Sequence, residues 1–327
     1  MKKLDTFTPF ALLLCSLLLC PGMAQAEDIS GTITTTVTIY ENSRLVGDVT
    51  CVVVDEPCIR FGASHIKLRL NGFTMTGRAN PPSNCVPPDP TLVGFLPEDG
   101  IATDGQSHVA ILGPGLVQRF RRYGIIVGLF PNPNLILSSK VTVKHVTSHH
   151  NCFSGLQLAF VSDSIIEENV SVRNAIASGA FSCGGTCILQ SDNNRIRRNE
   201  YSGNGLASPN NDFGIGILAG SDGNVIEENS VGGNTNGIWI GATAGSGNVV
   251  RRNIIAGNPP IQLGVTGGVD IRDNSPAGTI TFKENLCITY QGFATSPPCP
   301  NIPKFAVRHH PQSHDGDDDD EDDDDDK

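Results

Sequence analysis

The sequence of 327 residues predicts an all-β fold, in which short parallel strands stack into a solenoid of about eight coils with a cap at each end. Two motifs that recur at intervals of roughly 20–30 residues predict this fold, as does a composition rich in turn formers. The chain contains 36 glycines and 21 prolines, a larger share than in an average globular domain. Short apolar segments separated by glycine and asparagine turns are typical of solenoids.

The first motif is a glycine followed by an apolar residue, any residue and a second apolar residue. Gly124-Ile125-Ile126-Val127 is a typical copy. Copies begin at Gly100, Gly124, Gly155, Thr186, Gly214, Gly237 and Pro260, and an earlier copy begins at Cys58. Because side chains alternate along a strand, we expect the two apolar residues to point into the solenoid and the residue between them to point outward.

The second motif falls between copies of the first and consists of an apolar residue, two polar residues and an asparagine. Its asparagines are Asn169, Asn199, Asn229, Asn253 and Asn274. Asparagines that stack at one bend of successive coils can hydrogen-bond to one another along the axis, which explains their recurrence.

The two polar residues before these asparagines alternate in charge from copy to copy. The pairs are Glu167/Glu168, Arg197/Arg198, Glu227/Glu228 and Arg251/Arg252. Stacked one coil apart, they place opposite charges side by side on the outer face. We therefore expect a charge ladder that fixes the register of the coils, because a slip of one coil would bring like charges together.

Together, the patterns N-x-[IV]-x-x-N and G-I-x-[IL] over residues 58–285 resemble the right-handed parallel β-helix repeat family. That family includes pectin-lyase-like enzymes, alginate epimerases and periplasmic accessory proteins. The resemblance implies the right-handed parallel β-helix fold but no particular activity. Where alginate epimerases carry Tyr-Gly-Phe-Asp-Pro-His, this chain has Tyr123-Gly124-Ile125-Ile126-Val127-Gly128, so the aspartate and the histidine are missing.

The ends of the chain differ from its repeats. Lys2 and Lys3, an apolar stretch and Ala24-Gln25-Ala26 together predict a signal peptide cleaved near Ala26, and therefore a secreted or periplasmic protein. No later segment is apolar and long enough to predict a membrane span. The expected organisation is a signal peptide (1–26), N-terminal strands and cap (27–57), the parallel β-helix (58–285), a C-terminal cap (286–308) and a disordered His/Asp-rich tail (309–327).

The formal net charge of −11 comes almost entirely from the tail, because residues 315–327 contain eleven acids and one lysine. The nearly neutral remainder argues against a nucleic-acid partner. No cofactor and no metal site are expected in the body of the protein. The acidic run can bind Ca²⁺ or other divalent cations weakly. Its candidate ligands are Asp317, Asp318, Asp319 and Asp320.

Eight cysteines remain after the signal peptide, an even number that favours disulfides in an exported protein. Short spacings predict that Cys51 bonds to Cys58 in the N-terminal cap and that Cys287 bonds to Cys299 in the C-terminal cap. The middle four are open. One possibility joins Cys152 to Cys183, which we expect one coil apart. The other joins Cys183 to Cys187 and leaves Cys85 for Cys152, and Cys187 can also be a free, buried thiol.

The outward positions of the first motif show no carboxylates in neighbouring copies, which argues against hydrolase chemistry on this face. Trp239, the only tryptophan, occupies one of these positions and can stack on a sugar ring. Gln157, Gln190 and Gln262 can bond to sugar hydroxyls. The leading prediction is non-catalytic binding of a polysaccharide.

Two other functions stay open. A polysaccharide lyase or related enzyme acting on acidic glycans would use Arg122, His150 and Asp212, which lie beside the predicted strands. A purely structural or adhesive surface protein would use none of these side chains.

Overall fold

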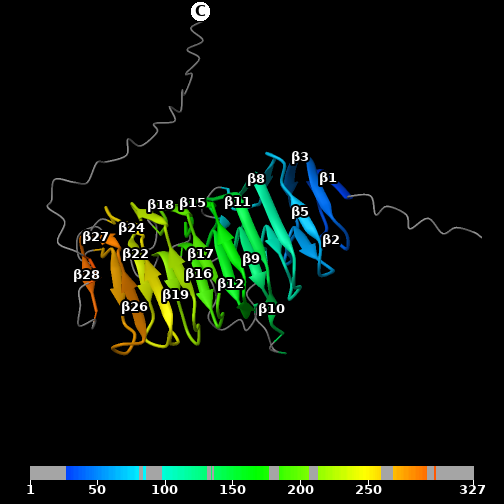
Figure 1. The fold of residues 1–327 in the computed structure, drawn as a ribbon. Coiled ribbons are helices and arrows are strands. Elements are labelled where there is room, and N and C mark those ends of the chain that lie inside the picture. The colour runs from blue at the N-terminus through cyan, green and yellow to red at the C-terminus, as the bar shows by residue number, and fades with distance from the viewer. Residues whose placement is uncertain are drawn as a thin grey trace, which may run out of the picture.

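A computed structural model describes residues 27–80, 84–85, 98–130, 134, 136–176, 184–205, 213–258, 268–292 and 298–299. All regular elements in these ranges are β-strands, and every strand pair is parallel. The coils stack along one axis from β1 at the N-terminal end to β28 at the C-terminal end (Figure 1). No helix in the described ranges is apolar and long enough to cross a membrane. The expected signal peptide and acidic tail lie outside these ranges.

Two long sheets make the walls of the solenoid. Sheet A has 16 strands: β1 (Glu27–Ile33), β3 (Ser43–Cys51), β5 (Lys67–Arg69), β6 (Thr74–Thr76), β8 (Ala110–Gln118), β11 (Thr142–His149), β14 (Ile165–Glu167), β15 (Val170–Val172), β17 (Arg195–Arg197), β18 (Glu200–Ser202), β20 (Val225–Glu227), β21 (Ser230–Gly232), β23 (Asn248–Arg251), β24 (Ile254–Ile255), β26 (Ile280–Lys283) and β27 (Leu286–Cys287). Sheet B has ten: β2 (Val37–Ile39), β4 (Ile59–Phe61), β7 (Ile101–Ala102), β9 (Ile125–Gly128), β12 (Leu156–Ala159), β16 (Gly184–Leu189), β19 (Phe213–Ile217), β22 (Asn236–Ile240), β25 (Ile271–Asp273) and β28 (Tyr290–Gln291). A small third sheet pairs β10 (Ser138–Ser139) with β13 (Val161–Ser162).

Each coil contributes one strand to sheet B and, in most coils, two short strands to sheet A. For example, β14 and β15 pair with β17 and β18 of the next coil, and β16 pairs with β19. The number of strands in sheet B therefore equals the number of coils. The ten strands described exceed the about eight coils that the sequence predicts. The additional strands are β2 and β28, which lie in the segments expected to form the caps.

The apolar core runs along the inside of the coils, as the alternation of side chains predicts. Ile215, Ile217, Ile238 and Ile240 point inward from β19 and β22 and are completely buried. Burying one such side chain contributes roughly 1.5–3 kcal/mol, so the stack of inward residues supplies the main favourable term for folding.

Two copies of the motifs are aligned differently from the sequence prediction. Thr186 pairs with Leu156, and Cys187 pairs with Gln157, so the fourth copy of the first motif begins at residue 185 rather than 186. In addition, Ile271 pairs with Ile238 in sheet B, which makes residues 271–273 a copy of the first motif and not of the second. A shift of one residue reverses which side chains face inward.

Asparagines form three ladders along the axis, where the sequence predicts one. At each rung the amide oxygen accepts hydrogen bonds from the backbone N–H, and at most rungs also from the side-chain amide, of the asparagine one coil earlier. The predicted ladder contains Asn169, Asn199, Asn229, Asn253 and Asn285. The second contains Asn151, Asn174, Asn204, Asn234 and Asn258, and the third contains Asn194, Asn224 and Asn248. Asn285 replaces Asn274 as the fifth rung, because Asn274 follows β25 in sheet B.

The charge ladder is present on sheet A. Glu167 lies between Lys144 and Arg197 in register, with Nζ–Oε1 and Nη2–Oε2 distances of 3.0 and 2.6 Å, and also bonds to Arg198. Burial alone would raise the pKa of Glu167, but its three cationic neighbours outweigh burial and lower the pKa to about 2. The carboxylate is therefore charged throughout the neutral pH range.

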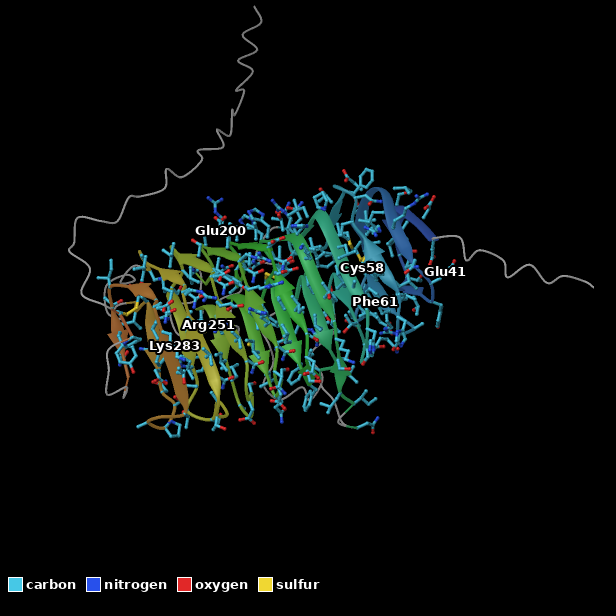
Figure 2. The ribbon with its side chains drawn as sticks, viewed as in Figure 1. Glu41, Cys58, Phe61, Glu200, Arg251 and Lys283 are labelled. Atoms are coloured by element: carbon cyan, nitrogen blue, oxygen red, sulfur yellow. A yellow bond between two sulfur atoms is a disulfide. The ribbon has the colours of Figure 1, made fainter. Side chains whose placement is uncertain are left out.

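The ladder continues through Glu227, which is 1 % exposed and pairs with Arg195, Arg251 and Arg252. At the C-terminal end, Arg251 and Lys283 occupy neighbouring strands (Figure 2).

Reversing both charges in the middle of the ladder is expected to destabilise the protein. In the variant Arg197→Glu/Arg198→Glu, two new carboxylates face buried Glu167 and Glu227, so we expect the unfolding midpoint to fall by roughly 5–10 °C. Thermal unfolding followed by circular dichroism measures it. Lys67→Glu/Arg69→Glu is the matched control, because both residues are exposed on sheet A and neither forms an ion pair within the described ranges. Equal midpoints for the two variants would contradict a role of the ladder in stability.

Three disulfides join cysteines that both lie within the described ranges. Cys51 bonds to Cys58 and Cys287 to Cys299, the two pairings expected near the ends. Cys85 bonds to Cys152, as one of the two possible pairings of the middle cysteines requires, so the possibility that joins Cys152 to Cys183 is excluded.

Cys187 is also disulfide-bonded, which excludes the free thiol. Several disulfides indicate an oxidising, extracytoplasmic location.

Candidate functional site

The outer face of sheet B is the surface on which the sequence places its candidate ligand-binding residues. The outward residues of neighbouring strands lie in register, about 4.8 Å apart. From the N-terminal to the C-terminal coil they are Thr38, Arg60, Ala102, Ile126, Gln157, Cys187, Gly216, Trp239, Arg272 and Gln291.

The middle of this column is covered by other parts of the chain. Ala102 and Ile126 belong to a second apolar cluster outside the solenoid, which also contains Cys85, Cys152 and Phe153. The disulfide between Cys85 and Cys152 holds this cluster against sheet B. No ligand can lie on these coils without displacing the cluster.

Two of the predicted glutamines do not lie on an open strand surface. Gln157 is 4 % exposed, and its Nε2 donates to the carbonyl oxygen of Leu158 at 2.8 Å. Gln190 is exposed but follows β16 in a turn with a φ of 46°, and Leu189 takes the outward position instead. Gln262 lies outside the described residues.

The column opens at its C-terminal end. Trp239 is half-buried, and one face of its indole stacks on Phe213 with ring centroids 4.5 Å apart and an interplanar angle of 20°. Its partner in register is Gly216, which has no side chain to cover the ring. The indole Nε1 is buried and has no hydrogen-bond acceptor in the described part of the chain.

The next two coils add polar side chains beside Trp239. Arg272 is half-buried, and its Nε donates to Oε1 of exposed Gln291 at 3.2 Å. Trp239, Arg272 and Gln291 therefore follow one another in three successive coils, and we call them the tryptophan strip. An aromatic ring, a guanidinium and an amide in one row provide stacking, a positive charge and hydrogen bonds for an extended polar ligand.

The sequence prediction missed Arg272 and Gln291. The sequence prediction assigned Ile271-Arg272-Asp273-Asn274 to the second motif, and this assignment places Arg272 on sheet A. The signal that it overlooked is Phe282-Lys283-Glu284-Asn285, a better copy of the second motif that leaves residues 271–273 for sheet B.

Arg122, the first residue of the predicted lyase site, has a structural partner. It is 2 % exposed, and its Nε and Nη2 donate to the two carboxylate oxygens of Asp99 at 2.8 and 2.6 Å. The guanidinium also lies 4.9 Å from the centre of the Tyr123 ring, and burial raises the pKa of Tyr123 to about 12. Arg122 therefore anchors the turn before β9 and is not available to a substrate.

The other two residues of that predicted site are His150 and Asp212. His150 lies in the turn after β11 with a φ of 52°. Asp212 lies outside the described residues. No group of three or more His, Cys, Asp and Glu side chains in the described ranges is arranged to hold a metal ion. Asp317 to Asp320 of the tail also lie outside them.

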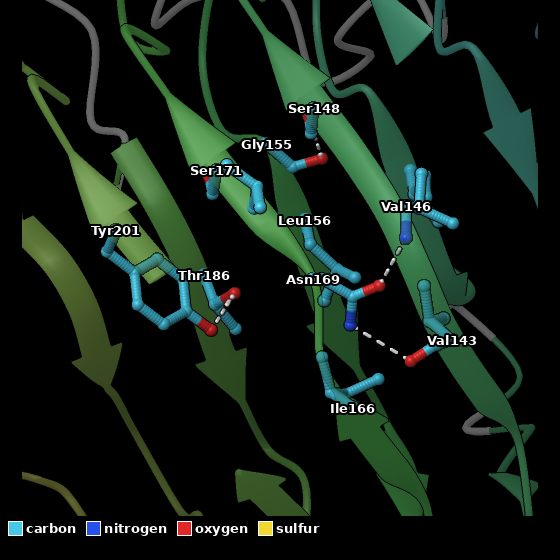
Figure 3. A pocket seen from close by; sticks show the side chains of 12 residues that line it. Val143, Val146, Ser148, Gly155, Leu156, Ile166, Asn169, Ser171, Thr186 and Tyr201 are labelled. Atoms are coloured by element: carbon cyan, nitrogen blue, oxygen red, sulfur yellow. Dashed lines mark hydrogen bonds between the residues drawn. The ribbon is translucent and has the colours of Figure 1, made fainter. Parts of the chain in front are cut away.

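A cavity inside the solenoid is too small for a ligand. Its volume is about 10 Å³, whereas ligand pockets reach roughly 300 Å³ or more. Figure 3 shows Tyr201 and Thr186 at its wall, where their hydroxyl groups are 2.9 Å apart. The cavity arises because Ser148 and Ser171 take places that larger apolar residues fill in other coils.

A family model described as right handed beta helix region matches residues 134–292. The chain has the right-handed parallel β-helix fold. A comparison with curated proteins finds no match.

Solved structures share the β-helix at low sequence identity. An alginate lyase from Paenibacillus sp. str. FPU-7 is 12 % identical, covers 84 % of this chain and 94 % of the lyase, and has a TM-score of 0.51. The A-module of mannuronan C-5 epimerase AlgE6 from Azotobacter vinelandii is 15 % identical over 80 % of this chain and 68 % of that chain, with a TM-score of 0.50. The Dettilon tailspike protein gp208 is 14 % identical over 79 % of this chain, with a TM-score of 0.48, and this chain covers 54 % of the tailspike's length. These similarities show the fold that this β-helix shares with carbohydrate-active proteins.

Proposed function

We propose that this β-helix protein is exported and binds an acidic polysaccharide, without cleaving it, at the tryptophan strip. The observation that carries the proposal is the open end of the sheet B column, where Trp239, Arg272 and Gln291 follow in register. Among the described outward residues, these three neighbouring side chains combine an accessible aromatic ring with polar groups.

Each residue of the strip has a distinct role. The indole of Trp239 is held by Phe213, so a sugar ring can stack on it at little cost in side-chain entropy. Arg272 is not paired with a carboxylate in the described ranges, and a guanidinium binds a carboxylate in a bidentate manner. This charge favours a uronate-containing glycan over a neutral one. Two of the structures described above are an alginate lyase and a mannuronan C-5 epimerase, so alginate and mannuronan are suitable first probes.

Binding to size-defined oligosaccharides tests the proposal. We expect Trp239→Ala to weaken binding of acidic and neutral oligosaccharides about tenfold, since one aromatic contact contributes roughly 0.5–1.5 kcal/mol beyond its area. Arg272→Ala is expected to weaken binding of the acidic ones alone. Isothermal titration calorimetry measures both. Tyr40→Ala is the matched control, because Tyr40 is an aromatic residue with 69 % exposure far from the strip. Unchanged affinity in Trp239→Ala would overturn the proposal.

A polysaccharide lyase is the second candidate function, and His150 is the observation that favours it. Burial, His149 and two arginines lower the pKa of His150 to about 4, so its imidazole is neutral at pH 7 and can accept a proton. The same oligosaccharides, incubated with the protein and followed by ultraviolet absorbance of unsaturated products, test this function. Turnover that disappears in His150→Ala would replace binding with catalysis.

A further inference from the structure

A second charged corner lies where sheet A turns into sheet B. Arg119, His150 and Arg173 occupy the same place in three successive coils, each with a left-handed φ of 59°, 52° and 49°. The backbone N–H of Arg119 donates to His149 at 3.2 Å, and the N–H of His150 donates to Val172 at 3.3 Å, which fixes the stack. We call Arg119, His149, His150 and Arg173 the basic corner.

The turn itself does not need these side chains. In the following coils the same left-handed place is taken by Gly203, Gly233 and Gly257. Glycine adopts this conformation without strain, whereas a residue with a Cβ atom is disfavoured by roughly 1 kcal/mol. The coils of Arg119, His150 and Arg173 therefore carry cationic or titratable side chains where glycine makes the turn in the coils that follow.

The charges of the basic corner are not balanced. Neither Arg119 nor Arg173 forms an ion pair within the described ranges, and no carboxylate is stacked between them. The charge ladder on sheet A is the contrast, because there each cation has a glutamate one coil away. The two arginines are two coils, roughly 10 Å, apart, and like charges at this distance repel one another unless an anion lies between them.

The two histidines lie between the arginines and share one hydrogen bond. Their Nδ1 atoms are 2.7 Å apart, so one ring donates and the other accepts. Burial and the two arginines lower the pKa of His149, and burial, His149 and the arginines lower the pKa of His150 to about 4. At neutral pH the corner thus presents two guanidinium groups and neutral imidazoles, a donor set that matches the oxygens of a carboxylate or a sulfate.

We propose that the basic corner is a binding site for an oxyanion group, the carboxylate or sulfate of an anionic polysaccharide. The basic corner lies before β9, β12 and β16, whereas the tryptophan strip lies on β22, β25 and β28. The two sites are separate, so an experiment that excludes binding at one of them does not exclude binding at the other. Two guanidinium groups held two coils apart, with His150 between them, would clamp one oxyanion, and an imidazole N–H would add a third donor.

Nuclear magnetic resonance of the histidine imidazoles tests this site in the full chain. The probes are sodium sulfate and an oligogalacturonate, each compared with sodium chloride at equal ionic strength. A bound anion stabilises the charged imidazolium, so we expect either probe to raise the pKa of His150 by about one pH unit. A shift with both probes assigns the site to any oxyanion, and a shift with the oligogalacturonate alone assigns it to a polymer.

The variant Arg119→Gly/Arg173→Gly is expected to bind the oligogalacturonate at least tenfold more weakly than the wild type does. Glycine is chosen because later coils make this turn with Gly203 and Gly233, so the fold should be kept, as thermal unfolding can verify. Lys140→Gly is the matched control, since Lys140 is an exposed cation with a left-handed φ of 55° elsewhere on the chain. Histidine pKa values that neither probe changes, or equal affinity in the double variant and the wild type, would overturn the proposal.

Discussion

Replacing Asn199 with alanine is expected to lower the free energy of unfolding by about 3–5 kcal/mol. Asn199 is 2 % exposed and is the second rung of its ladder. Its Oδ1 accepts from the backbone N–H and the Nδ2 of Asn169 at 2.9 and 3.0 Å. Its Nδ2 donates to the carbonyl of Ile166 and to Oδ1 of Asn229, both at 3.0 Å. Alanine leaves a backbone N–H and a carbonyl buried without partners, and each costs roughly 1–3 kcal/mol.

Chemical denaturation measures this change, with Asn274→Ala as the control. Asn274 is exposed, and its backbone N–H, which alanine keeps, donates to the carbonyl oxygen of Ile240, so the control should change stability by less than about 0.5 kcal/mol. A loss of stability in Asn274→Ala equal to that in Asn199→Ala would contradict the assignment of the ladder.

Replacing Asp99 with alanine is expected to lower the free energy of unfolding by about 3–5 kcal/mol, since the buried guanidinium of Arg122 loses the carboxylate that balances its charge. The carboxylate also accepts from the backbone N–H of Tyr123 at 3.1 Å, so its removal loosens the turn before β9. The free energy of unfolding measured by denaturation gives the size of the effect.

A double variant tests whether the loss of stability comes from the unbalanced charge of Arg122. Asp99→Leu/Arg122→Met removes both charges and fills similar volume, so most of the lost stability is expected to return. If Arg122 instead served a substrate, Asp99→Ala would change activity or binding while the stability stayed unchanged, and that outcome would contradict the structural role.

Much of the fold can be predicted from the sequence because a solenoid repeats the same local rules. Glycine before an apolar-x-apolar segment and asparagine after a charged pair each mark one place in the coil, and Glu167, Arg197 and Glu227 alternate as the prediction requires. The alignment went wrong at Thr186, where a polar residue takes an inward place. Its hydroxyl forms a hydrogen bond with the hydroxyl of Tyr201 on sheet A, a contact that the sequence pattern alone cannot reveal.

The candidate site was harder to predict, since it depends on which outward residues are covered. Trp239 and Gln157 occupy equivalent outward places in the repeat. Gln157 is buried, whereas Trp239 remains half-exposed. The cover over the middle coils includes Cys85, which lies 67 residues before its disulfide partner Cys152. Such long-range contacts leave no periodic signal in the sequence.

The fluorescence of Trp239 tests the central claim, polysaccharide binding at the tryptophan strip, most directly. The chain contains one tryptophan, so its emission reports on this site alone. Titration with an acidic oligosaccharide is predicted to change the emission in a saturable manner, with a dissociation constant equal to that from calorimetry. Binding detected by calorimetry while the emission of Trp239 stays constant would place the ligand elsewhere and contradict the account.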